Sequence, residues 1–285
     1  MQSGQASSTS DGAAIVRAMH QRLPAPARIL DDPISEKLVD ANSEEFRRRA
    51  ASIEALPESI RLRFTHIVMR SRYAEDCLAE AFKAGIRQYV VLGAGLDTFA
   101  YRQPEWSRQL EIIEVDHPAT QQVKLDRLKA AGVRIPDNVR FAAVDFEKVT
   151  LADGLLAARL DFTRPTFFSM LGVSQYIAPD AFDRTLKLIL SMPKSSEFVF
   201  TFVVPHQTLP ADEASHVAGI VARYAALGEP WINCLTPTEL LGKLAAMGFS
   251  RVYHLSPENA NRRYFSNRTD GLNASLHEQM VRVAV

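Results

Sequence analysis

The sequence predicts an α/β fold built on a seven-stranded, mostly parallel sheet with helices on both faces. Three observations predict it. Short apolar runs alternate with helical patterns from residue 85 onward, which is typical of a parallel sheet. A glycine-rich turn follows the first run, at Gly93-Ala94-Gly95, and two later runs each end in an acid, at Asp116 and Asp145.

Each element follows from a local pattern. Helices are expected where apolar residues recur at helical spacing, and a Pro or a capping pattern such as Thr236-Pro237-Thr-Glu239 marks a start. The last two strands read as a hairpin-like antiparallel pair. The expected strands lie near 88–93, 110–116, 139–145, 166–171, 197–204, 249–255 and 262–266. The expected helices after the first strand lie near 118–131, 151–160, 179–192, 211–227 and from 236 to Gly248.

The first 84 residues carry no strand pattern. Residues 1–12 are rich in Ser, Gly and Gln and lack an apolar segment, so we expect a disordered tail. Residues 13–84 are expected to form a helical cap over the carboxyl edge of the sheet. Its helices are expected over 13–23, from Pro33, over 44–56 and over 58–84. The remaining residues, 85–285, are expected to form the core, with a lid insertion near 205–230.

Composition narrows the class of protein. Of 285 residues, 47% are hydrophobic, which is enough for a substantial core, and the formal net charge is zero. Without a dense basic run, a nucleic-acid partner bound through phosphates is disfavoured. No apolar run approaches the length that spans a membrane. Two cysteines and seven histidines without metal-ligand spacing predict a reduced, cytoplasmic protein without a metal site.

The glycine turn predicts a nucleoside ligand. Gly93 and Gly95 would let a ligand approach the backbone at the carboxyl end of a strand. A dinucleotide fingerprint would need a third glycine where this chain has Thr98. The missing glycine disfavours a pyrophosphate, and therefore a nicotinamide oxidoreductase. S-adenosylmethionine, a nucleoside without phosphates, is the expected cofactor, with the backbone of Gly93, Ala94 and Gly95 against it.

The acids at the strand ends supply further contacts. Asp116 follows the turn by roughly 20 residues, the spacing at which a carboxylate accepts from ribose hydroxyls. Glu114 is the second candidate, because strand ends are the least certain part of such a reading. Asp145 is expected to accept from the adenine amino group, with the Phe146 backbone against the ring. A helix cap or loop contact is the alternative for Asp145.

Four segments give the chain a family resemblance. They are Arg70-Ser-Arg72-Tyr-Ala-Glu-Asp76, Leu92-Gly-Ala-Gly-Leu-Asp-Thr-Phe-Ala-Tyr-Arg102, Glu114-Val-Asp-His-Pro118 and Leu171-Gly-Val-Ser-Gln-Tyr176. On these the sequence resembles the leucine carboxyl methyltransferase-like group of class I methyltransferases, which includes polyketide O-methyltransferases. The resemblance implies a Rossmann-like fold and S-adenosylmethionine as methyl donor. Many members carry a Glu where this chain reads Ser169-Met-Leu171, which removes a polar contact here.

The resemblance also bears on the cation for the donor carboxylate. Arg70 or Arg72 could take it, because a guanidinium forks onto two oxygens. Alternatively, each Arg lies on a helix face and pairs with Glu75 or Asp76. The resemblance favours a binding role for Arg70. From Tyr101 and Arg102, in the second segment, we expect packing and a structural ion pair.

The acceptor is expected beyond the fourth and fifth strands. Tyr176 could orient an acceptor oxygen or simply pack under the lid, and His206 is the best-placed candidate base. The leading hypothesis is an O-methyltransferase acting on a small-molecule carboxylate or hydroxyl, in secondary metabolism. The absence of an obvious His–Asp pair in the sequence leans towards a carboxylate, which needs no base. The alternatives are a catalytically silent S-adenosylmethionine-binding module and a carboxyl methyltransferase acting on a protein C-terminus.

Overall fold

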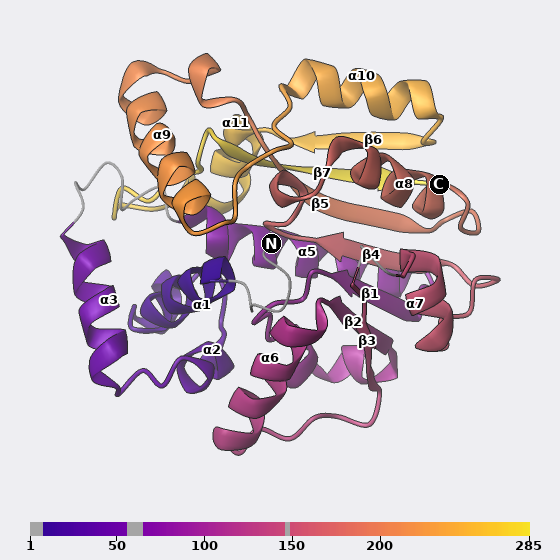
Figure 1. Ribbon diagram of the computed structural model, residues 1–285, viewed down its shortest axis with the longest axis horizontal. Helices are drawn as coiled ribbons and strands as arrows, with labels where there is room; N and C mark the ends of the chain where they lie inside the picture. The colour runs from indigo at the N-terminus through magenta and orange to yellow at the C-terminus, as the bar shows by residue number, and fades with distance from the viewer. Residues whose placement is uncertain (1–7, 56–64, 146–148) are drawn as a thin grey trace.

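A seven-stranded sheet forms the centre of the computed structural model, which describes residues 8–55, 65–145 and 149–285 (Figure 1). The strand order is β3-β2-β1-β4-β5-β7-β6. The first five strands run parallel, and β7 is antiparallel to β5 and to β6. The strands are β1 (Gln88–Leu92), β2 (Glu111–Asp116), β3 (Val139–Ala143), β4 (Thr166–Met170), β5 (Glu197–Val203), β6 (Arg251–Leu255) and β7 (Glu278–Ala284). The predicted fold class is thus confirmed.

The second strand of the predicted closing hairpin, over 262–266, is wrong, whereas the first is confirmed as β6, which pairs antiparallel with β7. Residues Asn261–Phe265 form the π-helical turn η7 after the short helix α11 (Pro257–Ala260), and the seventh strand is instead Glu278–Ala284. Arg262 pairs with Glu258 four residues earlier, which is a helical spacing. The Tyr-Phe pair that suggested a strand fits a helical turn equally well, because short apolar runs do not distinguish the two.

The predicted helices agree with the structure to within a few residues, except at the amino end. Helix α1 begins at Ser8, so residues 8–12 are helical where a disordered tail was expected. The first part of the predicted helix over 58–84 lies outside the described residues. The helices are α1 (Ser8–Gln21), α2 (Pro33–Leu38), α3 (Glu44–Glu54), α5 (Thr65–Lys83), α6 (Pro118–Ala130), α7 (Leu151–Ala157), α8 (Pro179–Leu190), α9 (Ala211–Ala226) and α10 (Pro237–Met247).

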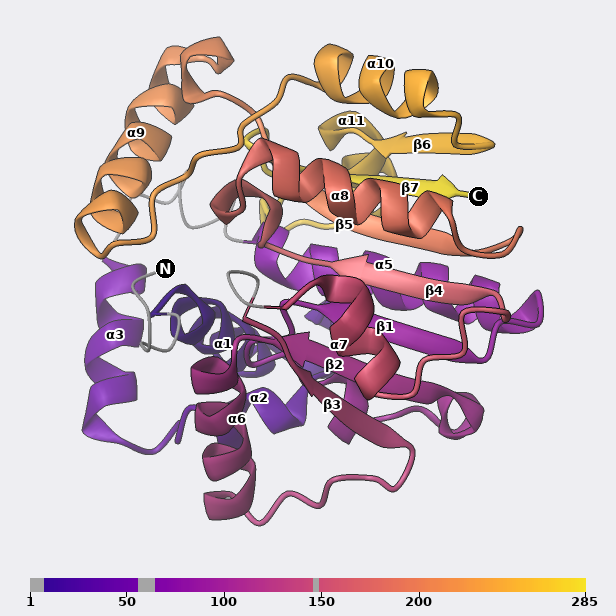
Figure 2. The ribbon, with the colours of Figure 1, turned by 45° about the vertical axis from the view of Figure 1, so that its right-hand side comes forward.

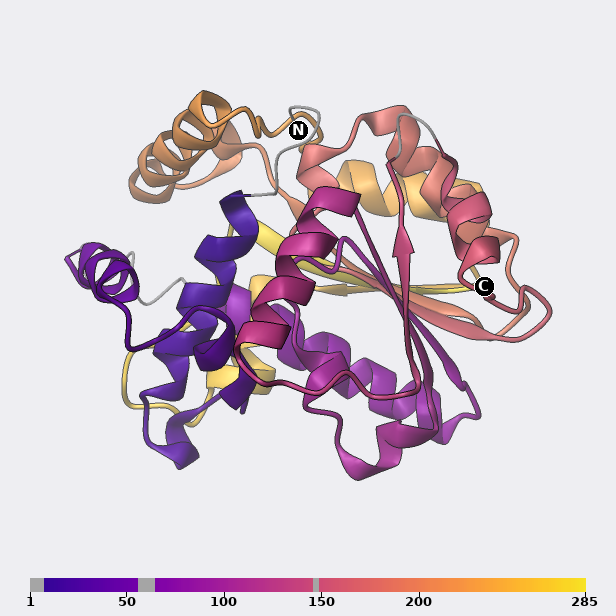
Figure 3. The ribbon, with the colours of Figure 1, turned by 60° about the horizontal axis from the view of Figure 1, so that its bottom comes forward.

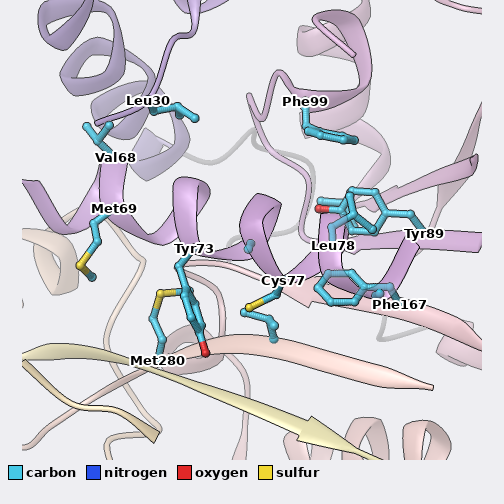
Figure 4. Packing of buried hydrophobic residues seen from close by; sticks show 14 of the residues in the cluster. Leu30, Val68, Met69, Tyr73, Cys77, Leu78, Tyr89, Phe99, Phe167 and Met280 are labelled. Atoms are coloured by element: carbon cyan, nitrogen blue, oxygen red, sulfur yellow. The ribbon is translucent and has the colours of Figure 1, made fainter. Parts of the chain in front are cut away.

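Helices cover the sheet on both faces (Figure 3). On one face, α5 packs its apolar stripe against the strands, with Tyr73 and Cys77 towards Met280 and Leu78 towards Phe167 (Figure 4). On the other face, α7, α8 and α10 cover alternate residues of the same strands, such as Phe198 on β5. Burial on both faces explains why most residues of β1, β4 and β5 are apolar.

A helical cap lies beyond the carboxyl ends of the parallel strands. Helices α1, α2 and α3 gather there with α9, at the left of the sheet in Figure 1 and again in Figure 2. Buried polar contacts hold α1 against the rest of the protein. Arg17 of α1 donates to Asp32 at 3.1 Å and to the carbonyl of Leu96. Asp11 pairs with Arg127 of α6 at 2.6 Å. Among the described residues, no helix is long and apolar enough to cross a membrane.

The cap contains a histidine that must stay neutral. His20 Nε2 accepts from the backbone N–H of Ile29 at 2.8 Å, and burial, aided by Arg268 and Arg28, lowers its pKa from 6.5 to about 4. Between these values the unfolded chain binds more protons than the folded one. Stability is therefore expected to fall by about 2 kcal/mol as the pH drops from 6.5 towards 4.

Denaturant unfolding of the wild type and of His20→Gln at several pH values measures this loss. The wild-type curve should be steeper in that window, because the amide of Gln does not titrate. Parallel curves for the two proteins would contradict the prediction.

Candidate functional site

The glycine turn and the end of β2 meet at the carboxyl edge of the sheet. Leu92 is in register with Val115, so Gly93 follows β1 directly beside the last residues of β2. Asp116 Oδ2 accepts from the backbone N–H of Gly95, and Oδ1 accepts from that of His117 at 2.7 Å. Burial raises the pKa of Asp116, and these two N–H groups oppose the rise. A half-buried carboxylate is thus fixed against the turn.

The turn itself lies within a close-packed cradle. Gly93 and Gly95 have φ of +69° and +44°, which disfavours a side chain. A Cβ on Gly93 would lie 2.4 Å from Val173 after β4, and one on Gly95 would lie 3.2 Å from Ser10 of α1. Ala94 is held by its N–H to the Val115 carbonyl at 3.0 Å. The first turn of α1 therefore covers the glycine turn.

Glu114 lies away from this edge, inside the protein. Its carboxylate is 2.7 Å from Lys124 Nζ of α6 and accepts from the hydroxyl of Tyr101 at 2.7 Å, and both charged side chains are at most 2% exposed. Oε1 has no hydrogen-bond partner among the described residues. Burial raises the pKa of Glu114, against the charge of Lys124. This contact set gives Glu114 a structural role, and the ligand role predicted for Asp116 stays a prediction.

The two candidate arginines lie on different faces of α5. Arg70 shares the sheet-facing stripe with Tyr73 and reaches the carboxyl edge, where a Cβ on Gly172 would lie 2.5 Å from its Nη1. The same nitrogen donates to both carboxylate oxygens of Glu278, at 2.9 and 3.0 Å. Burial, the largest single influence, would raise the pKa of Glu278, but the charge and hydrogen bond of Arg70 together with His66 and His277 lower it.

Arg72 forms an ion pair on its own helix, which is the alternative that the sequence left open. It pairs with Asp76 at 2.8 Å and donates to the carbonyl of Ile29 at 3.1 Å. The expected structural ion pair is confirmed nearby: Arg102 binds Glu75 and lies 3.4 Å from Asp32. The structure therefore brings Arg70, and not Arg72, to the edge that carries Gly172.

The structure describes only part of the segment that is predicted to contact the adenine. Asp145 follows β3 and is half-buried, and its carbonyl accepts from the N–H of Val149 at 2.9 Å. Phe146 lies outside the described residues. Asp97 accepts from the backbone N–H of Phe99 at 2.9 Å, so it caps the turn that follows the glycines. The roles predicted for Asp145 and Phe146 stay predictions.

The predicted acceptor residues lie on two short turns after β4 and β5. Tyr176, in η5 (Ser174–Tyr176), accepts a hydrogen bond from Trp231 Nε1 at 3.2 Å and is also hydrogen-bonded to Thr9 of α1. Burial raises the pKa of its hydroxyl. His206 begins η6 (His206–Thr208), next to α9. Among the described residues, no hydrogen bond joins Tyr176 to His206, and the side chain of Tyr176 is the more constrained of the two.

Sequence reasoning missed a histidine–acid pair. His277, just before β7, has Nδ1 3.4 Å from Glu213 Oε1 of α9, and the two side chains are 7% and 1% exposed. Trp231 stacks on His277 with ring centroids 6.2 Å apart. The two residues are far apart in sequence, and no spacing signal joins them. The structure thus contains a His–Glu pair, although the sequence shows no obvious His–Asp pair.

These contacts close into a circuit around the carboxyl edge. From the glycine turn it passes through Ser10 and Thr9 to Tyr176, then Trp231, and through His277 to Glu278. Glu278 binds Arg70, and the guanidinium of Arg70 lies against Gly172. The next residue after Gly172, Val173, packs against Gly93. In the following paragraphs and subsections we call this set of residues the edge circuit.

The edge circuit fits a methyl donor of the expected kind. Asp116 offers a fixed carboxylate for a ribose diol. Arg70 uses only Nη1 towards Glu278, so Nε and Nη2 donate to no other described residue and can fork onto a carboxylate. A carboxylate for the ribose diol and a guanidinium for the donor carboxylate are two of the contacts that S-adenosylmethionine needs.

Comparison with known proteins agrees with this fit. Residues 11–190 match the profile of the family described as leucine carboxyl methyltransferase. The chain is 35% identical, over 296 aligned positions, to a Bacillus subtilis protein named "Putative S-adenosyl-L-methionine-dependent methyltransferase YktD". That alignment covers 96% of each chain.

Solved structures share the fold. A methyltransferase structure from Thermobifida fusca, described as putative, superimposes with a TM-score of 0.57 at 17% identity, covering 99% of this chain and 96% of that one. A DUF574 family protein from Streptomyces avermitilis gives a TM-score of 0.53 at 16% identity, covering 96% of each. At such identities the likeness concerns the fold alone.

Proposed function

Because the chain belongs to the leucine carboxyl methyltransferase family and is an S-adenosylmethionine-dependent methyltransferase, we propose that it methylates an oxygen of a small molecule. The acceptor oxygen is a carboxylate or a hydroxyl, and the resemblance to polyketide O-methyltransferases supports a place in secondary metabolism. When bound, the donor supplies an electrophilic methyl carbon on a sulfonium.

The observation that carries the proposal is the edge circuit beyond β4 and β5. Three aromatic side chains that carry polar atoms line the acceptor side, namely Tyr176, Trp231 and His277. Such groups hold a small planar molecule and orient an oxygen by hydrogen bonds. The cover formed by α1 and α9 favours a small acceptor over a protein C-terminus (Figure 2).

Different residues of the chain bind the donor, orient the acceptor and exclude water. The Gly93–Gly95 backbone and Asp116 hold the nucleoside, and Arg70 holds the donor carboxylate with the nitrogens that Glu278 leaves unused. Tyr176 orients the acceptor oxygen, and the first turn of α1 excludes water from the turn. Positioning and desolvation are what methyl transfer chiefly requires, because no new charge has to be stabilised.

Methyl transfer from isotope-labelled S-adenosylmethionine tests the proposal. We would offer the protein a panel of phenols, a panel of carboxylic acids and a peptide ending in leucine, and follow the label by mass spectrometry. An ester is cleaved by alkali and an aryl ether is not, so the treatment identifies the methylated oxygen.

We expect a labelled ester or ether on a small molecule, and a lower kcat for Tyr176→Phe. Label found only on the peptide would overturn the small-molecule acceptor. Label found only on nitrogen, carbon or sulfur would overturn the oxygen acceptor.

A further inference from the structure

A hydrogen-bonded His–Glu pair stands at the start of β7. His277 Nδ1 lies 2.7 Å from Ser275 Oγ and 3.4 Å from Glu213 Oε1. The same Glu213 oxygen accepts from the backbone N–H of Leu276 at 3.1 Å, which fixes the carboxylate against this segment. Helix α9 thus brings an acid to a histidine that the sheet positions.

The acid decides which ring nitrogen carries the proton. An ionised carboxylate can only accept a hydrogen bond, so its contact with Nδ1 is favourable only when Nδ1 bears hydrogen. Ser275 Oγ already accepts from the backbone N–H of His277 at 3.2 Å and can accept from Nδ1 as well. In this tautomer Nε2 keeps its lone pair, and within the described part of the chain Nε2 makes no hydrogen bond.

The imidazole belongs to the edge circuit. Trp231 stacks on it at an interplanar angle of 16°, and the same indole donates to Tyr176. On its other side His66 approaches edge-on, with ring centroids 5.0 Å apart. The next residue, Glu278, holds Arg70. A basic nitrogen therefore lies among the groups that we assign to the acceptor and to the donor carboxylate.

We propose that His277 is the general base that takes the proton from an acceptor hydroxyl, and that Glu213 is a positioning residue acting through it. This inference rests on the proposed function and narrows its acceptor to a phenol or an alcohol. The acceptor O–H proton moves to Nε2 while the oxygen bonds to the methyl carbon. The electron pair of the broken carbon–sulfur bond stays on sulfur, which becomes a neutral thioether, and the imidazolium later releases its proton to water.

Histidine ¹⁵N spectra of the whole protein test the pair without any acceptor. The His277 signals are those that vanish in His277→Gln. We expect the Nδ1–H tautomer in the wild type and in Glu213→Asp, and a mixture of tautomers in Glu213→Gln. A wild-type His277 protonated on Nε2 alone, or spectra unchanged by Glu213→Gln, would overturn the proposal.

Turnover gives the second readout, with the phenol and carboxylic acid panels as probes. His277→Gln should lower kcat with a phenol by about 100-fold, the contribution typical of a general base. It should change KM little. A nitrophenol that is already ionised at the assay pH should be methylated by His277→Gln nearly as fast as by the wild type.

The matched control is His254→Gln on β6, outside the edge circuit. Loss of phenol methylation in His206→Gln but not in His277→Gln would assign the base to His206 and overturn this inference. If the wild type methylates no oxygen in either panel, the proposed function fails. The spectra then still report whether Glu213 fixes the tautomer.

Discussion

Replacing Glu114 by Gln is expected to lower the free energy of unfolding by about 3–5 kcal/mol, although Glu114 lies in one of the segments that resemble the family. The substitution keeps the volume but leaves Lys124 charged and without a counter-ion in a site that is almost fully buried. Removing one partner of a buried ion pair costs this much because the other charge stays desolvated. Chemical denaturation gives the value directly.

The double variant Glu114→Gln/Lys124→Met separates the pair from the packing around it. It should recover most of the loss, because an apolar replacement of a buried pair is often neutral. Glu111→Gln on the same strand is the matched control. Glu111 pairs with Arg140 and Arg164 at the surface, where such contacts contribute at most about 1 kcal/mol. Equal losses for Glu111→Gln and Glu114→Gln would show that the site is not desolvated.

Replacing Asp116 by Ala is expected to weaken the binding of S-adenosylmethionine by at least about 100-fold. Two charge-assisted hydrogen bonds to a ribose diol contribute about 1.5–3 kcal/mol each. The carboxylate also holds the N–H groups of Gly95 and His117, so its loss loosens the turn as well. Calorimetric titration with the donor or its demethylated product measures the change.

Asp97→Ala is the matched control for Asp116→Ala, because Asp97 is in the same loop but accepts only from Phe99 in the described structure. It should weaken donor binding by less than about tenfold, in line with the loss of one local hydrogen bond. Since burial raises the pKa of Asp116, wild-type affinity should also start to fall at a higher pH than an exposed aspartate would give, as acid protonates it. A wild-type affinity in Asp116→Ala would assign the ribose to another residue.

Most of the fold was predictable because its signals are local. The apolar runs at Tyr89–Leu92 and Phe198–Val203 are strands buried on both faces, and Gly93 ends the first of them. The missed strand, Glu278–Ala284, lies between β5 and β6, and Glu278 and Arg282 interrupt its apolar pattern. Both charges are paired, by Arg70 and by Glu197, and a sequence does not show such partners.

The grouping of the predicted donor residues at one edge was predictable, whereas the His277–Glu213 pair was not; the binding roles of these residues stay predictions. Gly93, Gly95 and Asp116 lie at the ends of neighbouring strands, so strand order alone brings them together. The sequence already ranked Arg70 above Arg72 and Asp116 above Glu114. The structure adds the contacts of these residues: Arg70 reaches Gly172, and Glu114 is paired with Lys124. The His277–Glu213 pair joins a strand end to an inserted helix, which only the tertiary fold determines.

The place of β7 in the sheet also bears on synthesis of the protein. Strand β5 pairs with β4 on one side as soon as both have been made, but its other side waits for β7. Until α9, α10 and β6 have followed from the ribosome, β5 presents an open edge with Phe198, Phe200 and Phe202 along it. Such an edge is a template for pairing between nascent chains, and non-local pairing is slow to close it. Slower translation or a chaperone that covers apolar edges should therefore raise the yield of native protein.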